Sequence, residues 1–199
     1  MNKNEILESL RQQAVKFHQA LIDGKVYVKN IDKQEFLFRI DKLVDDNAER
    51  IVENVEGLEL STLALPVNLL YVLEDVLPFA IWDYEFGYDG FFDDLNKLFS
   101  KTSHIVEWGY DSEASQLKYS LDNQTWTINN LEHTAEVDPE IYSEILDNIN
   151  NYLQKQDEIL YAAVTGDQTG LLILVPSNSL ENLKDFLISN DDPRASMFY

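Results

Sequence analysis

Residues 104–128 read HIVEWGYDSEASQLKYSLDNQTWTI, and this stretch decides the class of the fold. Before it the apolar residues recur with a helical period, whereas within it they alternate with polar residues. The alternation places six large apolar side chains on one face of two strands: Val106, Trp108, Tyr110, Leu117, Tyr119 and Leu121. An Asp122-Asn123 turn then leads to a third strand at 125–128, so the stretch predicts an antiparallel three-strand meander.

Downstream of the meander the sequence predicts a helix, a hairpin and a final helix. Asp138 can cap a helix that runs to about residue 154, with Pro139 at its first position. Residues 158–164 and 170–175 are apolar and flank a loop of turn-forming residues, which is typical of a hairpin. The last helix is expected over residues 180–188.

Upstream of the meander the pattern is helical. We expect helices over residues 4–22, from Asp32 to Gly57, over 66–77, and over 90–99 with Asp89 as its cap. Asp32 and Glu35 have the spacing of a capping box. Together these elements predict an α+β fold in which an antiparallel sheet, meander plus hairpin, packs against several helices, with a helical N-terminal half.

The net charge of −21 is unevenly distributed along the 199 residues. Residues 1–50 hold nine acidic and nine basic side chains, whereas residues 51–199 hold 27 acidic and six basic ones. No linker rich in Gly, Ser or Pro interrupts the chain. We therefore expect a single domain over 1–199, a neutral helical pair over 1–57 followed by an acidic remainder over 58–199; a separate small second domain is the alternative.

Composition excludes several classes of chemistry. The chain has no cysteine, which excludes disulfides, thiolate catalysis and Cys-ligated zinc. The three histidines, His18, His104 and His133, have no metal-ligand spacing, and neither a phosphate loop nor a Gly-x-Ser-x-Gly elbow is present. We expect no catalytic residue, no cofactor and no metal site. The acidity disfavours nucleic acid and membrane as partners, and the absence of a signal-like N-terminus indicates a cytoplasmic protein.

Residues 79–94 are the one segment in which side chains cluster by chemistry. Aromatic and acidic residues interleave there, and an extended chain would place them on opposite faces. Three interpretations compete: aromatic core with solvated acids, a recognition surface, and a divalent-metal or paired-carboxylate site at Asp83, Glu85 and Asp89. For the recognition surface we select eight partner-binding residues: Trp82, Asp83, Tyr84, Glu85, Tyr88, Asp89, Asp93 and Asp94.

Three functional hypotheses follow from these features. A small, cysteine-free, strongly acidic chain resembles, as a class, the bacterial immunity proteins that neutralise nuclease toxins. The favoured hypothesis is an inhibitory protein that sequesters a basic protein partner, because one-sided carboxylates steer a cationic partner to the surface. The alternatives are a scaffold or adaptor domain without enzymatic activity, and a carboxylate or divalent-metal enzyme. The sequence leaves the oligomeric state and the identity of the partner open.

Overall fold

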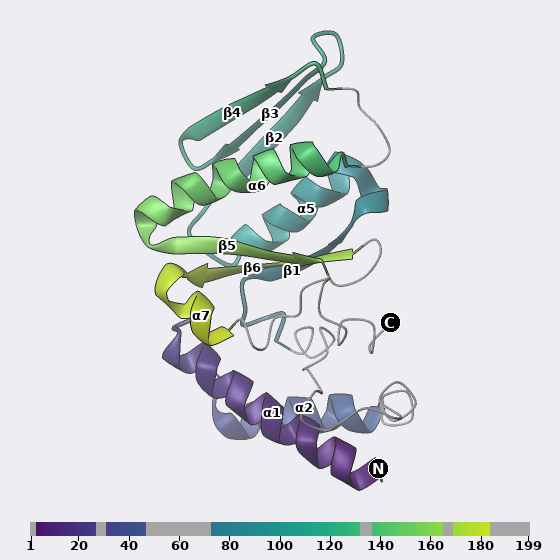
Figure 1. The fold of residues 1–199 in the computed structure, drawn as a ribbon, viewed down its shortest axis with the longest axis vertical. Coiled ribbons are helices and arrows are strands. Elements are labelled where there is room, and N and C mark those ends of the chain that lie inside the picture. Colours follow the sequence, from purple (N-terminus) through teal and green to yellow (C-terminus); the bar gives the residue numbers. More distant parts are fainter. Residues whose placement is uncertain (1–2, 27–30, 47–72, 132–136, 165–168, 184–199) are drawn as a thin grey trace. The chain divides into compact units, whose positions relative to one another are not determined.

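The computed structural model describes residues 3–26, 31–46, 73–131, 137–164 and 169–183 (Figure 1). Contacts divide the chain into two compact units, which are treated separately below. The first unit comprises residues 1–77, 163–167 and 178–199, and the second comprises 78–162 and 168–177. The predicted α+β class is confirmed, because two antiparallel three-stranded sheets pack with helices and the N-terminal segment of the chain is helical. The single domain over 1–199 stays a prediction.

The first unit is helical over the residues described. It contains α1 (Lys3–Asp23), α2 (Lys33–Asp46) and the short α7 (Leu180–Leu183). Ala14, Phe17 and Leu21 of the predicted apolar stripe are buried in α1, and the His18 ring stacks on Phe36 of α2 with ring centroids 4.2 Å apart. The helical period of the sequence thus predicts correctly which face of α1 is buried.

The expected cap of α2 is present. The Asp32 Oδ1 atom accepts a hydrogen bond from the backbone N–H of Glu35 at 2.8 Å, which satisfies one donor of the first turn. The Glu35 carboxylate forms an ion pair with Arg39, and the Arg39 guanidinium also binds Asp75. Because Arg39 joins α2 to the segment before Leu77, it ties two parts of this unit together.

The second unit holds both sheets. One sheet has the order β1 (Phe79–Asp83), β6 (Thr169–Pro176), β5 (Glu158–Val164), and the other is the meander β2 (Val106–Asp111), β3 (Gln116–Leu121), β4 (Gln124–Asn129). The meander register pairs Trp108 with Tyr119 and Tyr119 with Trp126, so the alternation seen in the sequence is confirmed. The predicted hairpin is also confirmed as the neighbouring strands β5 and β6.

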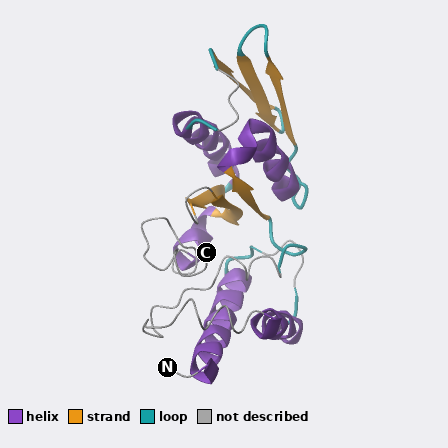
Figure 2. Cartoon of the chain, turned by 90° about the vertical axis from the view of Figure 1, so that its right-hand side faces the viewer, coloured by secondary structure: helices purple, strands orange, loops and turns teal. Residues whose placement is uncertain are grey.

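Two helices, α5 (Gly87–Phe99) and α6 (Pro139–Leu153), lie between the two sheets of this unit (Figures 1 and 2). Short 3₁₀ turns precede α5 (η2, Tyr84–Phe86), follow α6 (η3, Gln154–Gln156) and follow β6 (η4, Ser177–Ser179). The apolar faces of both helices and of the meander meet in one core, which includes Phe91, Phe92 and Ile145. This arrangement buries the stripe of each helix against a sheet on either side.

The start of α6 is as predicted, and the start of α5 is not. The Asp138 side chain accepts from the Glu140 N–H at 2.8 Å, with Pro139 next to the cap. In contrast, α5 begins at Gly87 and not at residue 90, and Asp89 lies within its first turn instead of capping it. The reason is the η2 turn, which leads directly into the helix through Gly87 at φ 60°, a left-handed conformation that glycine adopts freely.

Several expected elements lie wholly or partly outside the described residues. These are the part of the 66–77 helix before Leu73, the end of the second helix, the hairpin loop and the last helix after Leu183. Strand β1 was not expected from the sequence, and it pairs antiparallel with β6. In the part of the chain that is described, no helix has the length and apolarity needed to cross a membrane.

Candidate functional site

The aromatic members of the predicted site are core residues. Trp82 and Tyr88 are each only 1% exposed, and the Trp82 ring packs against Phe91 and Tyr142. Burial raises the pKa of the Tyr88 hydroxyl. The side chain of Tyr84 lies outside the description. A partner at this surface would therefore meet the carboxylates, with Trp82 and Tyr88 supporting the backbone from beneath.

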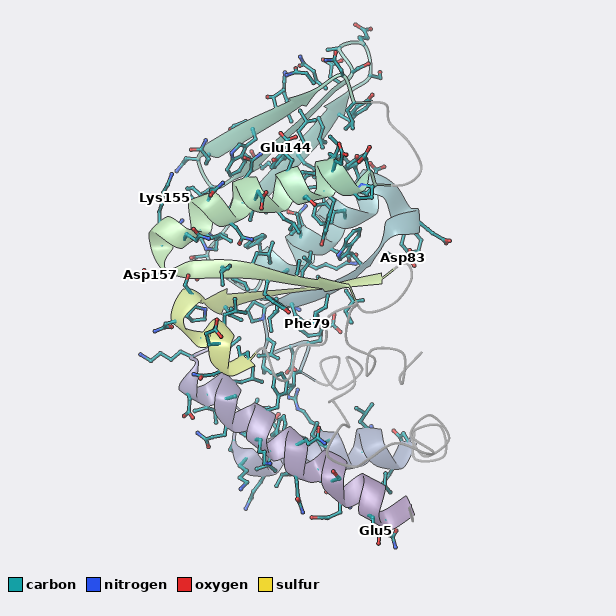
Figure 3. All side chains as sticks on the ribbon, viewed as in Figure 1. Glu5, Phe79, Asp83, Glu144, Lys155 and Asp157 are labelled. Carbon is teal, nitrogen blue, oxygen red and sulfur yellow. The ribbon has the colours of Figure 1, made fainter. Side chains whose placement is uncertain are left out.

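Three carboxylates of the predicted site, Glu85, Asp89 and Asp93, are exposed, whereas Asp83 is half-buried and the Asp94 side chain is only 14% exposed. The Asp83 side chain accepts from the Glu85 N–H at 2.9 Å, and Asp94 pairs with Lys97 at 2.6 Å. Asp89 and Asp93 are exposed on α5. Figure 3 shows Asp83 projecting from one end of the second unit. Among the residues described, no group of three or more His, Asp or Glu side chains is arranged to hold a metal ion.

Phe86 is the residue of this surface that sequence reasoning missed. Its side chain is 69% exposed, although it is a large aromatic group. The alternating pattern placed it with the buried aromatics, but the η2 turn replaces the extended chain and rotates Phe86 outward. A Cβ atom at Gly90 would lie 2.3 Å from the Phe86 Cβ, so Gly90 leaves room for Phe86 beside the helix.

We call the surface formed by Asp83, Glu85, Phe86, Asp89 and Asp93 the acidic end. Phe86, Asp89 and Asp93 share one face of the segment by their spacing of three and four residues. Asp83, Glu85 and Asp89 lie before or within the first turn of α5, where the helix dipole favours negative charge, whereas Asp93 lies further along the helix. The surface is thus an exposed aromatic ring bordered by acids on a supported turn.

The N-termini of α5 and α6 are held together at the acidic end. The backbone N–H of Asp138 donates a hydrogen bond to the Tyr88 hydroxyl at 3.2 Å. Trp82 and Tyr142 pack at 4.5 Å between ring centroids just below. Because these contacts join the start of both helices, the first turn of α6, with Glu140, adjoins the acidic end.

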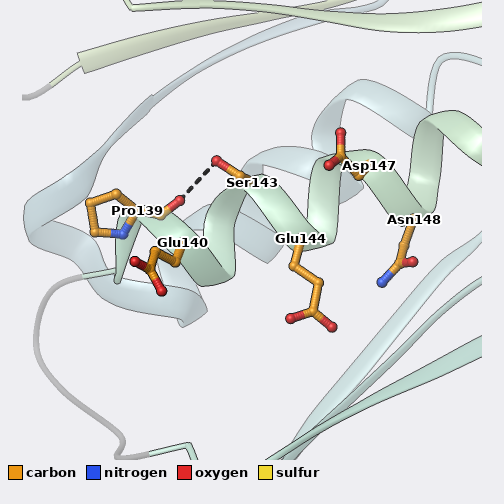
Figure 4. Close-up of a pocket in the computed structure, with 6 residues that line it drawn as sticks. All are labelled: Pro139, Glu140, Ser143, Glu144, Asp147 and Asn148. Carbon is orange, nitrogen blue, oxygen red and sulfur yellow. Dashed lines mark hydrogen bonds between the residues drawn. The ribbon is translucent and has the colours of Figure 1, made fainter.

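An open groove of about 550 Å³ follows α6 from its N-terminus (Figure 4). Its lining comes from six residues of this helix: Pro139, Glu140, Ser143, Glu144, Asp147 and Asn148. The Asn148 amide donates to the Tyr119 hydroxyl of β3 at 2.9 Å, and burial raises the pKa of Tyr119 to about 12. The sequence of α6 contains three acidic residues and no Lys or Arg, so the groove extends the negative surface.

A buried histidine lies elsewhere in this unit. The His104 Nδ1 atom is 2.8 Å from an Asp122 carboxylate oxygen, and Nε2 is 2.7 Å from a Glu158 oxygen. Burial disfavours the charged ring, but the two carboxylates outweigh it and raise the pKa of His104. Burial likewise opposes ionisation of Asp122, but hydrogen bonds from His104, the Ile105 N–H and Tyr152 lower the pKa of Asp122.

The sequence contained no signal for this cluster, because Glu158 is 54 positions from His104. The carboxylates approach opposite sides of the imidazole ring, so the three groups do not converge on one point where a metal or a substrate atom could sit. The described contacts therefore make it a structural bridge.

The chain matches no protein-family model, no curated protein and no solved structure in the comparisons made with each of them.

Proposed function

We propose that this protein binds and sequesters a basic protein partner through the acidic end, for example as an immunity-type protein that neutralises a toxin. The observation that carries the proposal is Phe86, which is 69% exposed and bordered by the carboxylates of Asp83, Glu85 and Asp89. This proposal keeps four carboxylates of the sequence-based site and leaves out Asp94, which pairs with Lys97. It assigns Trp82 and Tyr88 a supporting role and adds Phe86. It also keeps the cytoplasm as the location.

An exposed aromatic ring within a polar rim has the composition of an interface hot spot. Aromatic anchors contribute most of the binding free energy at protein interfaces, and the surrounding polar groups exclude water from the contact. The η2 turn places Phe86 on the surface, and Gly90, which has no Cβ atom, leaves room beside it. Phe86 therefore supplies affinity that charge alone does not.

The charge of the second unit supports a basic partner. Residues 78–162 and 168–177 hold 17 acidic and four basic side chains, which leaves a net charge of −13. Lys97 lies in the last turn of α5, Lys101 follows α5 and Lys155 follows α6. Figure 3 places Asp83 and Lys155 at opposite ends of this unit. Such polarity orients an approaching cation and raises the association rate at low salt.

The groove along α6 gives the partner a second contact. Glu140, Glu144 and Asp147 lie four and three residues apart, so their carboxylates share the exposed face of one helix. Like charges at these spacings destabilise a helix by about 0.2–0.5 kcal/mol per pair. A basic segment that lies along α6 would neutralise this repulsion and extend the interface from the acidic end.

The test compares baits that differ in one aromatic ring. Immobilised wild-type chain, Phe86→Ala and Phe38→Ala are exposed to extract of the native host at low salt, and retained proteins are identified by mass spectrometry. Phe38 is 70% exposed on α2 and provides a control of matched exposure in the first unit. We expect a basic protein retained by wild type and Phe38→Ala, with roughly tenfold or greater loss of affinity in Phe86→Ala.

Two double variants distinguish the effect of charge at the acidic end from the effect of the overall charge. Asp89→Asn with Asp93→Asn removes two charges from the acidic end, and Glu107→Gln with Glu113→Gln removes two from exposed positions of the meander. The purified partner should bind the first variant more weakly and the second almost normally, with affinity falling as salt rises. Equal effects of both pairs, or retention of basic proteins regardless of Phe86, would contradict the proposal.

A further inference from the structure

His104 connects the two sheets of the second unit through its ring. Asp122 belongs to the turn between β3 and β4, and Glu158 is the first residue of β5 in the other sheet. The ring nitrogens lie 2.8 Å and 2.7 Å from the carboxylate oxygens of these two residues. The edge of the ring packs on Phe99 at the end of α5, and the side chain is only 5% exposed.

The geometry demands a proton on both ring nitrogens. An ionised carboxylate only accepts hydrogen bonds, so each of the two short contacts needs an N–H on the imidazole. A neutral ring carries one N–H and would turn the lone pair of its other nitrogen toward a carboxylate. While both carboxylates are ionised, the two contacts can therefore coexist only when His104 is an imidazolium ion.

The two carboxylates differ in the hydrogen bonds that they make besides the one with His104. Asp122 accepts two further hydrogen bonds, from the Ile105 N–H at 2.9 Å and from the Tyr152 hydroxyl of α6 at 3.0 Å. Its backbone N–H also donates to the Ile105 carbonyl at 2.7 Å. For Glu158 the described side-chain contact is with His104. When the ring loses one proton, the firmly held Asp122 keeps the remaining N–H, and the contact with Glu158 is lost.

We propose that His104, Asp122 and Glu158 form a pH-dependent bridge between the sheets, which opens at Glu158 when His104 loses a proton and thereby releases the start of β5. On opening, the Nε2–H bond breaks, the proton passes to solvent and the electron pair stays on Nε2, while the Nδ1–H remains hydrogen-bonded to Asp122. The ionisable groups that contact the ring are Asp122 from the meander and Glu158 from β5; Tyr152 from α6 acts through Asp122. Phe99 from α5 is uncharged.

The direction of the switch follows from these neighbours. The pKa of His104 is raised above its unfolded value of about 6.5, so the stabilisation is complete below that pH and is lost as pH rises through the folded pKa. The pKa of Asp122 is lowered, so its contribution is present above its unfolded value and is lost as pH falls through the folded one. The bridge is thus closed below the raised pKa of His104 and opens as the pH rises through it.

Nuclear magnetic resonance of the His104 ring in the full chain tests the protonation state. Below the folded pKa of His104 both ring nitrogens should carry protons, and above it only the Nδ1 proton should remain. Amide exchange of β5, corrected for its intrinsic pH dependence, should accelerate over the same pH range. A pKa of His104 that is not raised above its unfolded value of about 6.5, or exchange of β5 that does not change as His104 titrates, would overturn the proposal.

Glu158→Gln supplies the matched perturbation, because it removes the charge but keeps the size and leaves His104 in place. We expect the pKa of His104 to fall by roughly one unit or more, and β5 to exchange faster at pH 7 than in wild type. Glu107→Gln on β2, an exposed position, is the control and should leave both measurements unchanged. A Glu158→Gln protein that behaves like the control in both measurements refutes the bridge.

Discussion

At the scale of single residues, Trp82 packs closely against Gly170 in the second unit. They are direct partners in the β1–β6 register, and a Cβ atom at position 170 would lie 2.3 Å from the indole Nε1 of Trp82. The indole ring therefore occupies the space above the glycine. Because Trp82 also packs on Phe91 and Tyr142, it has no free volume into which to retreat.

Replacing Gly170 by Ala should lower the free energy of unfolding by about 1–3 kcal/mol, since the new methyl group overpacks the core. Urea denaturation followed by tryptophan fluorescence measures the change. Gly109→Ala is the control: in the described part of the chain no atom lies within 4 Å of where its Cβ would be. Similar stability of both variants would show that Trp82 adapts.

At the scale of the element, α6 combines a defined start, a buried face and an acidic face. Asp138 caps the helix, while Ile145, Ile149 and Leu153 are buried toward the core. The opposite face carries Glu144 and other acids of the groove. The same helix thus stabilises the fold on one side and offers the proposed partner a charged surface on the other.

The contribution of the α6 cap to the free energy of unfolding should be measurable with a single substitution. Asp138→Ala removes the acceptor for the Glu140 N–H and should cost about 1 kcal/mol of unfolding free energy. Asp138→Ser keeps a capping oxygen and should recover most of the loss. Equal losses for Ala and Ser in thermal denaturation would mean that the cap contributes little.

Reversing a charge on the acidic face of α6 should raise the stability of the protein and weaken its binding to the basic partner. Glu144→Lys places a cation four residues after Glu140 and three before Asp147, so two repulsive pairs become attractive. Each pair should contribute about 0.2–0.5 kcal/mol to stability, while affinity for the basic partner should fall. Glu144→Gln should lie between wild type and the lysine variant in both properties; a lysine variant with unchanged affinity would remove α6 from the interface.

At the scale of the whole molecule, the net charge of −21 opposes compaction of the chain. The described ion pairs contribute little stability against this repulsion, because most of them are at least partly exposed to solvent. Salt should therefore act mainly by screening repulsion between carboxylates.

Raising potassium chloride from about 0.01 M to about 0.15 M, which shortens the screening length from about 30 Å to about 8 Å, should increase the melting temperature. The same change should weaken binding of the basic partner, because screening acts on attraction across the interface as well. A melting temperature that falls with added salt would indicate that attractive pairs such as Arg39–Asp75 dominate instead.

Much of the fold follows from local sequence. The pairing of Trp108, Tyr119 and Trp126 across the meander is implied by alternation and by short turns, since neighbouring strands joined by tight turns have little freedom of register. The cap at Asp138 and Pro139 also depends on adjacent residues alone. For these features the free energy is decided within a few positions of the chain.

The sequence by itself determined the alternation of the meander, the helical stripes, the caps at Asp32 and Asp138, and the location of the negative charge. Only the tertiary structure decided that β1 pairs with β6, that Trp82 and Tyr88 are core while Phe86 is exposed, and that Glu158 meets His104. The physical reason is sequence distance. Local patterns select the conformation of a segment. These contacts, in contrast, depend on which distant segments pack together and exclude water, and that packing also decides which side chains stay exposed.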